Sequence, residues 1–229
     1  MRKNNSLYAI VPHRGVNAGK SRLSSALGDV ARGKLNRWLL ARTLGVVTQW
    51  LSDAKHCVVV SPCEVTLALA RRAGTLPLPE HASTTGLNDA LAQAAAYAAA
   101  LGAQRLLILP CDLPRLEVSA LQAMEAVPIA GGDVVIAPDR HHTGTNALLV
   151  DAGVREFAFG ADSYAQHLAQ GNARGVRTVA CVHEPLAFDL DTVEDFDAWV
   201  KSGDAPADFL ATLPQAAPCT RAAVTSRTK

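Results

Sequence analysis

The stretch that decides the fold is residues 7–23, LYAIVPHRGVNAGKSRL. An apolar run, Leu7–Val11, predicts a buried strand, and a glycine-containing loop, Pro12–Gly19, follows it. A strand that ends in such a loop and leads into a helix leaves backbone N–H groups unpaired, and these groups suit phosphate binding. Three cations lie in or just after the loop: Arg14, Lys20 and Arg22. We therefore expect a nucleotide-phosphate loop here, the alternative being an ordinary surface loop.

The loop is one residue shorter than a P-loop. The P-loop pattern places four residues between its two glycines, whereas only three separate Gly15 from Gly19. Because loop length sets where the backbone amides point, we interpret the segment as a phosphate loop of another type. A P-loop-like kinase or NTPase, with Asp112 as its metal-side acid, remains the rival enzyme hypothesis. A nucleotide-binding module without turnover is the non-enzymatic alternative.

The composition suits one globular domain. The chain has 229 residues, 49% of them hydrophobic, which is enough to bury a substantial core. It has no apolar run long enough to span a membrane, and residues 1–5 lack the apolar stretch of a signal peptide, so we expect a cytoplasmic protein. The cysteines have no metal-type spacing, and we expect reduced thiols. They are Cys57, Cys63, Cys111, Cys181 and Cys219.

Charge is distributed unevenly along the chain, although the net charge is only +1. Residues 1–60 carry ten Lys or Arg against two acids, whereas residues 184–204 carry seven acids against one Lys. A uniformly basic face would indicate nucleic acid. Basic and acidic segments within one domain better fit a site where cations meet phosphates and carboxylates hold a metal, a solvated surface being the alternative. We expect small-molecule substrates, no nucleic acid and no membrane partner.

Short apolar runs alternate with helical patterns, which predicts an α/β fold with a mainly parallel, partly mixed sheet covered on both faces. The expected strands are Leu7–Val11, Cys57–Ser61, Arg105–Leu109, Asp133–Ala137, Ala147–Val150, Arg177–Val182 and Ala187–Leu190. The expected helices are Asp29–Leu51, Glu64–Arg72, Leu87–Ala100, Glu117–Ala126, Ser163–Asn172 and Val193–Lys201. We expect a single three-layer domain over residues 6–204, with its ligand at the carboxyl ends of the strands, and a disordered tail over 205–229.

Two acidic elements follow expected strands. Asp112 comes directly after Arg105–Leu109, where a carboxylate is costly unless it is solvated, paired or bound to a metal. Asp189 and Asp191 are two residues apart and share a face of an extended segment. Since Mg²⁺ prefers one or two carboxylates plus phosphate oxygens, we expect Asp112 with Asp189 or Asp191 to hold it. The alternative for Asp112 is that it caps the helix that follows it. Thr192 is the expected cap of the helix at Val193–Lys201.

Three further polar segments are candidates for ligand binding. Gly86 lets a ligand approach the backbone, and the Asn88 amide suits base or ribose recognition, helix capping being its alternative. The loop at residues 139–146 offers cations, hydroxyls and an amide for a small anionic substrate. Its adjacent histidines would point apart, so zinc is disfavoured. Ser163 is a candidate N-cap of a helix whose N-terminus suits a phosphate or carboxylate.

Taken in order, these motifs resemble the guanylyltransferases that activate a small phosphorylated acid on the way to coenzyme F-420. That family is related to nucleotidyltransferases of the GT-A-like fold, and the resemblance covers residues 7–202. The motifs that carry it are Ala18–Leu23, Gly86-Leu87-Asn88, Asp112-Leu113-Pro114, Thr143–Asn146, Phe159-Gly160 with Ser163, and Phe188–Thr192. The chain departs from the family pattern at His13-Arg14 and at Ala161-Asp162.

The resemblance implies transfer of GMP from GTP to a phosphorylated three-carbon acid with release of pyrophosphate. It implies that Lys20 and Arg22 contact the triphosphate, that Gly86 and Asn88 contact guanosine, and that Mg²⁺ is the cofactor; Arg14, a cation of the same loop, is expected to bind the nucleotide with them. Thr145, Gly160 and Ser163 would bind the acid. His141, His142 and Asp162 favour 3-phospho-D-glycerate as that acid, followed by phosphoenolpyruvate and then 2-phospho-L-lactate. A downstream deazaflavin-transferring enzyme would take the product, and the oligomeric state is left open, with a homodimer as one option.

Overall fold

The computed structural model describes residues 6–51, 53–211 and 213. Its strands form one seven-stranded sheet in the order β3-β2-β1-β4-β6-β5-β7. Their bounds are β1 Leu7–Pro12, β2 Cys57–Ser61, β3 Leu76–Pro79, β4 Arg105–Ile108, β5 Val134–Pro138, β6 Thr145–Asp151 and β7 Thr178–Ala180. Strand β6 runs antiparallel to β4 and β5, and the remaining neighbours are parallel. The expected mixed, mostly parallel sheet is confirmed.

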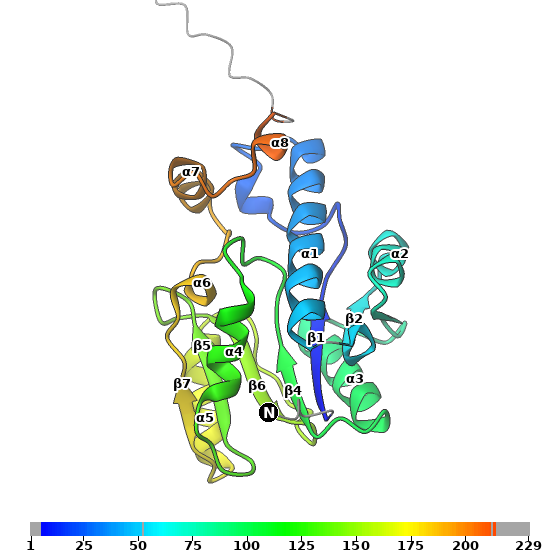
Figure 1. Ribbon diagram of the computed structural model, residues 1–229, viewed down its shortest axis with the longest axis vertical. Coiled ribbons are helices and arrows are strands. Elements are labelled where there is room, and N and C mark those ends of the chain that lie inside the picture. The colour runs from blue at the N-terminus through cyan, green and yellow to red at the C-terminus, as the bar shows by residue number, and fades with distance from the viewer. Residues whose placement is uncertain (1–5, 52, 212, 214–229) are drawn as a thin grey trace, which may run out of the picture.

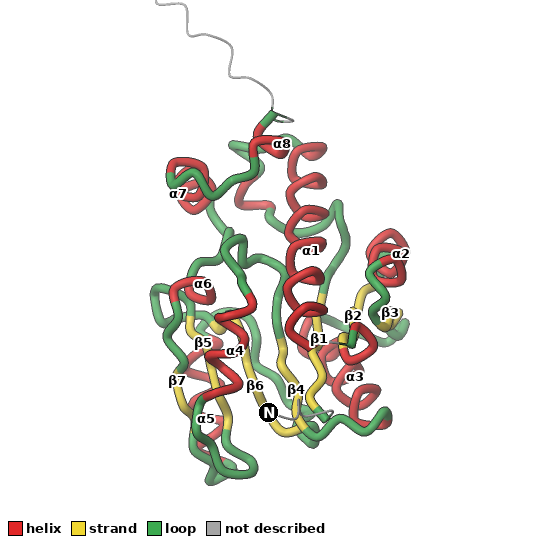
Figure 2. The backbone as a smooth tube through the Cα atoms, viewed as in Figure 1, coloured by secondary structure: helices red, strands yellow, loops and turns green. Residues whose placement is uncertain are grey.

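Helices cover both faces of the sheet, as Figures 1 and 2 show. The larger ones are α1 Asp29–Leu51, α2 Glu64–Arg72, α3 Leu87–Ala100, α4 Val118–Ala126 and α5 Ser163–Ala173. Alternate side chains of β1 explain the layering, because successive residues of a strand face opposite sides. Ala9 and Val11 belong to the core beneath α1 and α4, whereas Tyr8 and Ile10 belong to the core beneath α3. No helix in the described part of the chain could span a membrane.

A third apolar cluster packs the start of α1 against the last helices in the described part of the chain. The remaining helices of the described part are η1 Ser21–Leu23, η2 Ala54–His56, α6 Glu184–Ala187, α7 Val193–Lys201 and α8 Ala207–Leu210. Leu35 of α1 packs with Trp199 of α7 and Phe209 of α8, at one end of the molecule in Figure 1. The expectation of a disordered tail is therefore wrong for residues 205–211, because Phe209 anchors them in this core. Residues 214–229 lie outside the described part.

Two strand assignments differ from the sequence-based expectation. Strand β3 is not among the expected strands, because it contains Pro77 and Pro79 and proline cannot donate to a ladder; β3 tolerates both prolines as an edge strand. The expected strand Ala187–Leu190 is wrong, since it is the end of α6 followed by an extended loop. Its backbone bonds two separate loops rather than a strand: Arg140 N–H donates to Ala187 O, and Leu190 N–H donates to Asp112 O at 3.0 Å.

Candidate nucleotide-binding site

The loop after β1 is held in shape from both sides. On α1, the buried Asn36 amide donates to the carbonyls of Val16 and Ala18, at 3.1 and 3.0 Å. Gly15 has φ +131°, and a Cβ there would lie 3.0 Å from Cys63 Cβ, so only glycine fits this position. The loop geometry is therefore fixed by α1 and by the start of α2, and not by the loop sequence alone.

Lys20 links this loop to the acidic segment near the other end of the chain. Its Nζ donates to Leu190 O at 2.6 Å and lies 3.8 Å from Asp191 Oδ1, while its side chain is only 10% exposed. Of the other predicted phosphate contacts, Arg14 lines the same cavity, whereas Arg22 is exposed on η1 and is not among the lining residues. The structure thus brings Lys20 to Leu190, 170 residues further along the chain, and to the neighbouring Asp191.

The acidic side chains affect one another. Burial raises the pKa of Asp112, Lys20 opposes this, and the charge on Asp191 adds to it. Burial, with the charges of Asp112 and Asp191, also raises the pKa of Asp189 to about 6. The arrangement therefore gathers more negative charge than Lys20 neutralises, and a bound cation would relieve the difference.

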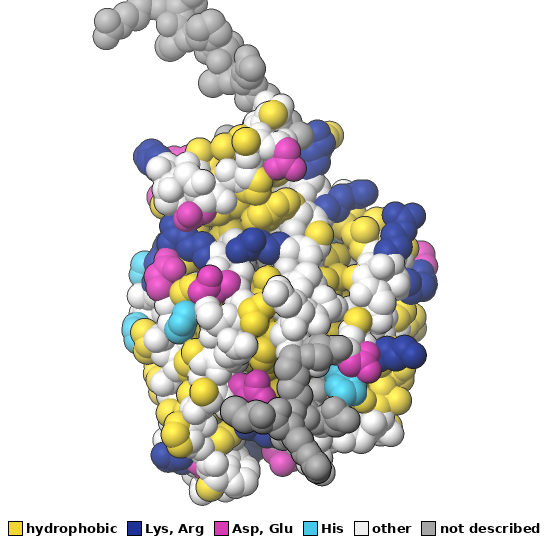
Figure 3. Space-filling view, in the orientation of Figure 1, with side chains coloured by type: hydrophobic (Ala, Val, Ile, Leu, Met, Phe, Trp, Pro, Cys, Tyr) yellow, Lys and Arg dark blue, Asp and Glu magenta, His cyan; other side chains and the backbone are white. Residues whose placement is uncertain are grey.

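Asp195 supports the acidic segment from beneath. Its carboxylate accepts the backbone N–H groups of Asp191 and Thr192, at 3.0 and 2.8 Å, and pairs with Arg140. The Thr192 hydroxyl in turn accepts the Asp195 N–H, so the expected cap is confirmed as a reciprocal capping box. Figure 3 shows basic and acidic side chains together below α7. This network orders the backbone from which Asp191 projects.

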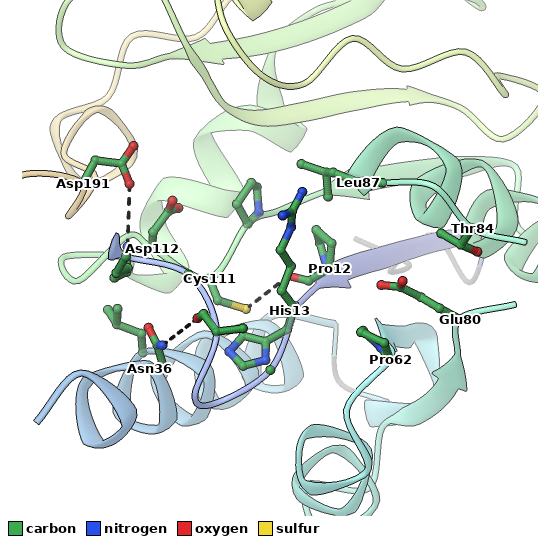
Figure 4. Close-up of a pocket in the computed structure, with 18 of the residues that line it drawn as sticks. Pro12, His13, Asn36, Pro62, Glu80, Thr84, Leu87, Cys111, Asp112 and Asp191 are labelled. Atoms are coloured by element: carbon green, nitrogen blue, oxygen red, sulfur yellow. Dashed lines mark hydrogen bonds and ion pairs between the residues drawn. The ribbon is translucent and has the colours of Figure 1, made fainter. Parts of the chain in front are cut away.

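These elements border a cavity of about 550 Å³ at the carboxyl edge of the sheet. Figure 4 shows Asp112 and Asp191 at one end of it and Glu80 and Thr84 at the other, with His13 between them. Five predicted residues line it: Arg14, Lys20, Gly86, Asp112 and Asp191. Asp189 and Asn88 are not among the lining residues. Open α/β sheets bind their ligands at this edge, so the cavity is the candidate ligand site.

Sequence reasoning missed several lining residues, which include His13, Asn36, Glu80, Thr84 and Thr85. His13 Nδ1 bonds Thr66 Oγ1 at 2.9 Å, and burial, together with Lys20, lowers the pKa of His13 to about 4. Burial raises the pKa of Glu80, against the opposing charge of Arg14. The sequence held one signal for Glu80: it lies in a polar loop just before Gly86.

The predicted acid-binding residues form a second cluster beside α5. The Ser163 hydroxyl accepts the Thr145 N–H at 2.9 Å, and Ser163 N–H donates to Gly160 O. Asn88 reaches the same region, where its amide pairs with both backbone groups of Phe159. Ser163 is the first residue of α5 and not its N-cap, because Asp162 holds the cap position in a left-handed conformation. The cluster lies outside the lining of the cavity.

The polar loop between β5 and β6 is mainly self-contained. Asp139 accepts the backbone N–H groups of His141 and Thr143 and thereby forms a tight turn. His142 is exposed and its ring lies edge-on to Tyr164, with the centroids 5.9 Å apart. The histidine side chains and Asp162 are exposed and do not line the cavity.

The donor atoms present fit Mg²⁺ better than they fit zinc. No cluster of three or more His, Cys, Asp or Glu side chains in the described ranges is arranged to hold a metal by itself. Mg²⁺ usually takes one or two carboxylates and completes its shell with phosphate and water oxygens, so such a cluster is not required. Asp112 and Asp191 supply hard oxygen donors on a cavity wall with excess negative charge. The four described cysteines are free thiols, and Cys219 lies outside the described residues.

The fold is shared with solved nucleotidyltransferases. A protein from Desulfovibrio desulfuricans G20 assigned as a nucleotide-diphospho-sugar transferase superposes with a TM-score of 0.62 at 15% identity, covering 88% of this chain and 89% of that one. A cytidylyltransferase from Leptospira borgpetersenii gives 0.56 at 11% identity, covering 83% of each chain. At these identities the likeness shows the fold alone. The expected architecture, that of nucleotide-diphospho-sugar transferases, is confirmed.

Closer relatives are found at the level of sequence. The phosphoenolpyruvate guanylyltransferase of Rubrobacter xylanophilus is 37% identical over 199 residues, covering 86% of this chain and 95% of the relative. That of Sphaerobacter thermophilus is 36% identical over 194 residues, covering 82% and 90%. The protein is a nucleotidyltransferase. A family model described as "Guanylyl transferase CofC like" matches residues 7–213, and the chain belongs to this family. The resemblance drawn from the motifs is confirmed.

Proposed function

We propose that the protein transfers GMP from GTP to phosphoenolpyruvate and releases pyrophosphate, as a step of coenzyme F-420 biosynthesis. The observation that carries the proposal is the meeting of Lys20, Asp112 and Asp191 at one end of a nucleotide-sized cavity. The relatives at 36–37% identity bear the name phosphoenolpyruvate guanylyltransferase, which favours this acid. The side chains that favoured 3-phospho-D-glycerate, His141, His142 and Asp162, are exposed, whereas Thr145 and Ser163, which are proposed to bind the acid, are buried.

The reaction needs alignment more than it needs proton transfer. The acceptor's phosphate is an anion near neutral pH, so one of its oxygens can attack the α-phosphorus of GTP without a general base. The bond from that phosphorus to the β-phosphate bridging oxygen breaks, and pyrophosphate leaves with both electrons. Lys20 neutralises charge that develops on the leaving pyrophosphate, and Arg14, which lines the same cavity, assists in binding the triphosphate.

When bound, Mg²⁺ would supply positive charge that offsets the negative charge of the triphosphate. Asp112 and Asp191 are its proposed ligands, with Asp189 adding charge behind them. The raised pKa values of Asp112 and Asp189 fit this role, because buried carboxylates crowded together without a cation resist ionisation. The residues before Asp112 continue from strand β4, and the Asp112 carbonyl accepts the Leu190 N–H. This bond holds the two acidic elements next to each other.

The nucleoside would occupy the other end of the cavity, where Gly86 lets its ring approach the backbone. Asn88 secures the Phe159–Gly160 turn beside it, through the paired bonds to Phe159. The acid would bind on that side, at Gly160, Thr145 and Ser163. The product, a guanosine diphosphate linked to the acid, would pass to a deazaflavin-transferring enzyme.

A pyrophosphate-release assay tests the proposal. GTP, ATP and CTP are each combined with phosphoenolpyruvate, 3-phospho-D-glycerate or 2-phospho-L-lactate, with Mg²⁺ present, and a reaction without acid serves as the blank. We expect pyrophosphate with GTP and phosphoenolpyruvate, at a kcat/KM at least tenfold above any other combination. Production of GDP or ADP with a phosphorylated product would instead indicate a kinase. Tight GTP binding without pyrophosphate from any acid would indicate a silent nucleotide-binding module.

A further inference from the structure

His167, on α5, is a buried histidine for which the proposed reaction so far has no use. It is 4% exposed, and both of its ring nitrogens have partners within the protein. Nδ1 lies 3.0 Å from the hydroxyl oxygen of Thr145, and Nε2 lies 3.2 Å from the backbone nitrogen of Ala158. The ring also packs edge-on against Phe159, with the centroids 4.9 Å apart. His167 therefore contacts β6 and the turn before Gly160 at the same time.

These contacts fix the tautomer. The Ala158 N–H can only donate, so Nε2 must be the nitrogen that carries a free electron pair. In a neutral imidazole the proton then resides on Nδ1. Burial lowers the pKa of His167 to about 4; a hydrogen bond with the Ser163 backbone opposes this shift, and the positive charge of Arg174 adds to it, so the ring is neutral near pH 7. Nδ1–H is thus the donor toward Thr145, and the Thr145 hydroxyl oxygen accepts.

The direction of that bond determines whether the Thr145 hydroxyl proton is available to a ligand. Because its oxygen accepts from His167, its own hydroxyl proton is free to be donated elsewhere. Ser163 is in the same position, since its hydroxyl oxygen accepts the Thr145 N–H. Neither hydroxyl donates to an acceptor within the described residues. Two neighbouring hydroxyl donors without internal acceptors suit an anionic oxygen, such as that of a carboxylate or phosphate.

We propose that His167 is a positioning residue for the acid acceptor: it locks the Thr145 hydroxyl so that its proton is presented, beside that of Ser163, to an anionic oxygen of the acid. The inference rests on the proposed function, in which Thr145 and Ser163 bind the acid. With the opposite tautomer, Thr145 would donate its proton to His167 and would have none left for the ligand.

Two amide variants separate this role from simple structural support. In His167→Asn the side-chain N–H replaces Nδ1–H and can still donate to Thr145, while the bond from Ala158 is lost. In His167→Gln the side-chain oxygen replaces Nε2 and can still accept from Ala158, while the donor to Thr145 is lost. Steady-state kinetics with GTP and phosphoenolpyruvate, together with calorimetric titration of phosphoenolpyruvate, give KM and affinity for each variant.

We expect His167→Gln to raise the KM for phosphoenolpyruvate about tenfold or more, and His167→Asn to change it less than about threefold, with the KM for GTP unchanged in both. Thr145→Val should raise the same KM about 10- to 100-fold, and adding His167→Gln to it should have no further effect. Additive effects of the two substitutions, or a larger effect from His167→Asn, would overturn the proposal in favour of structural support.

Nitrogen-15 NMR of the unliganded protein supplies a readout that does not depend on turnover. We expect a protonated Nδ1 and an unprotonated Nε2 for His167 between about pH 5.5 and 8. The Nε2–H tautomer would overturn the positioning role even if guanylyl transfer is active. Absence of pyrophosphate release by the wild-type protein would instead count against the proposed function, while calorimetric binding of the acid by the His167 variants would still test the positioning role.

Discussion

Replacing Lys20 by alanine removes a cation that lies between the phosphate loop and the acidic segment. Its Nζ lies 3.8 Å from Asp191 Oδ1, and the side chain is largely shielded from water. At about 4 Å two unit charges interact by roughly 4 kcal/mol at an effective dielectric constant near 20. Loss of one preorganised donor to transition-state charge typically costs about 3–4 kcal/mol. We therefore expect Lys20→Ala to raise the barrier by about 2–4 kcal/mol, which lowers kcat/KM roughly 30- to 1000-fold.

The same substitution should move the pH dependence of turnover. Lys20 lowers the pKa of Asp112, so its removal raises that pKa further. Since Asp112 has to be ionised to bind a cation, the acid limb of the kcat/KM profile should shift to higher pH. Lys34→Ala, an exposed lysine of α1, is the matched control and should leave pyrophosphate release unchanged. An unchanged kcat/KM in Lys20→Ala would refute the reasoning, and a change confined to the KM for GTP would assign Lys20 to ground-state binding.

Three further predictions follow from the same contacts. Asp112→Asn should abolish pyrophosphate release without lowering the melting temperature, because asparagine removes a charge that burial disfavours; normal turnover would take Asp112 out of the site. Folding raises the pKa of Asp189 to about 6, so this carboxyl group holds its proton more tightly in the folded protein than in the unfolded chain. Without Mg²⁺, the free energy of unfolding should therefore fall by about 1–2 kcal/mol more in wild type than in Asp189→Asn as pH rises from 4 to 7, measured by urea denaturation; equal slopes would contradict it. Phe209→Ala should destabilise the fold by about 3 kcal/mol, whereas the exposed Asp208→Ala should not, and equal denaturation midpoints would exclude Phe209 as an anchor.

Much of the sheet could be predicted from local patterns. Leu7–Val11 and Cys57–Ser61 are continuous apolar runs, and each emerges as a buried strand within a residue of its expected bounds. The failures have a common physical origin. β3 carries prolines that only an edge position tolerates, and the segment at 187–190 is extended because two loops pair with it. Neither the edge position of β3 nor the loops that pair with residues 187–190 can be recognised from the sequence.

The candidate site divides in the same way. The glycine-containing loop, Lys20 and Asp112 stand out because each follows an apolar strand, where a charged residue is informative. Glu80 and His13 gave weaker signals, because their place in the cavity depends on how β3 and α2 pack. Asn88 was expected to face the nucleoside, yet its amide is occupied by the backbone of Phe159, 71 residues away.

By itself, the sequence determined the family of the protein and the order of most strands and helices, because motifs, hydrophobic periodicity and residue type are local properties. Only the tertiary structure decided how Lys20 meets Asp191, how Asp195 orders the acidic segment, and which nitrogen of His167 carries the proton. These depend on hydrogen bonds between segments far apart in the chain. Such bonds form only after the apolar core has brought those segments within a few ångströms, and no local pattern encodes that approach.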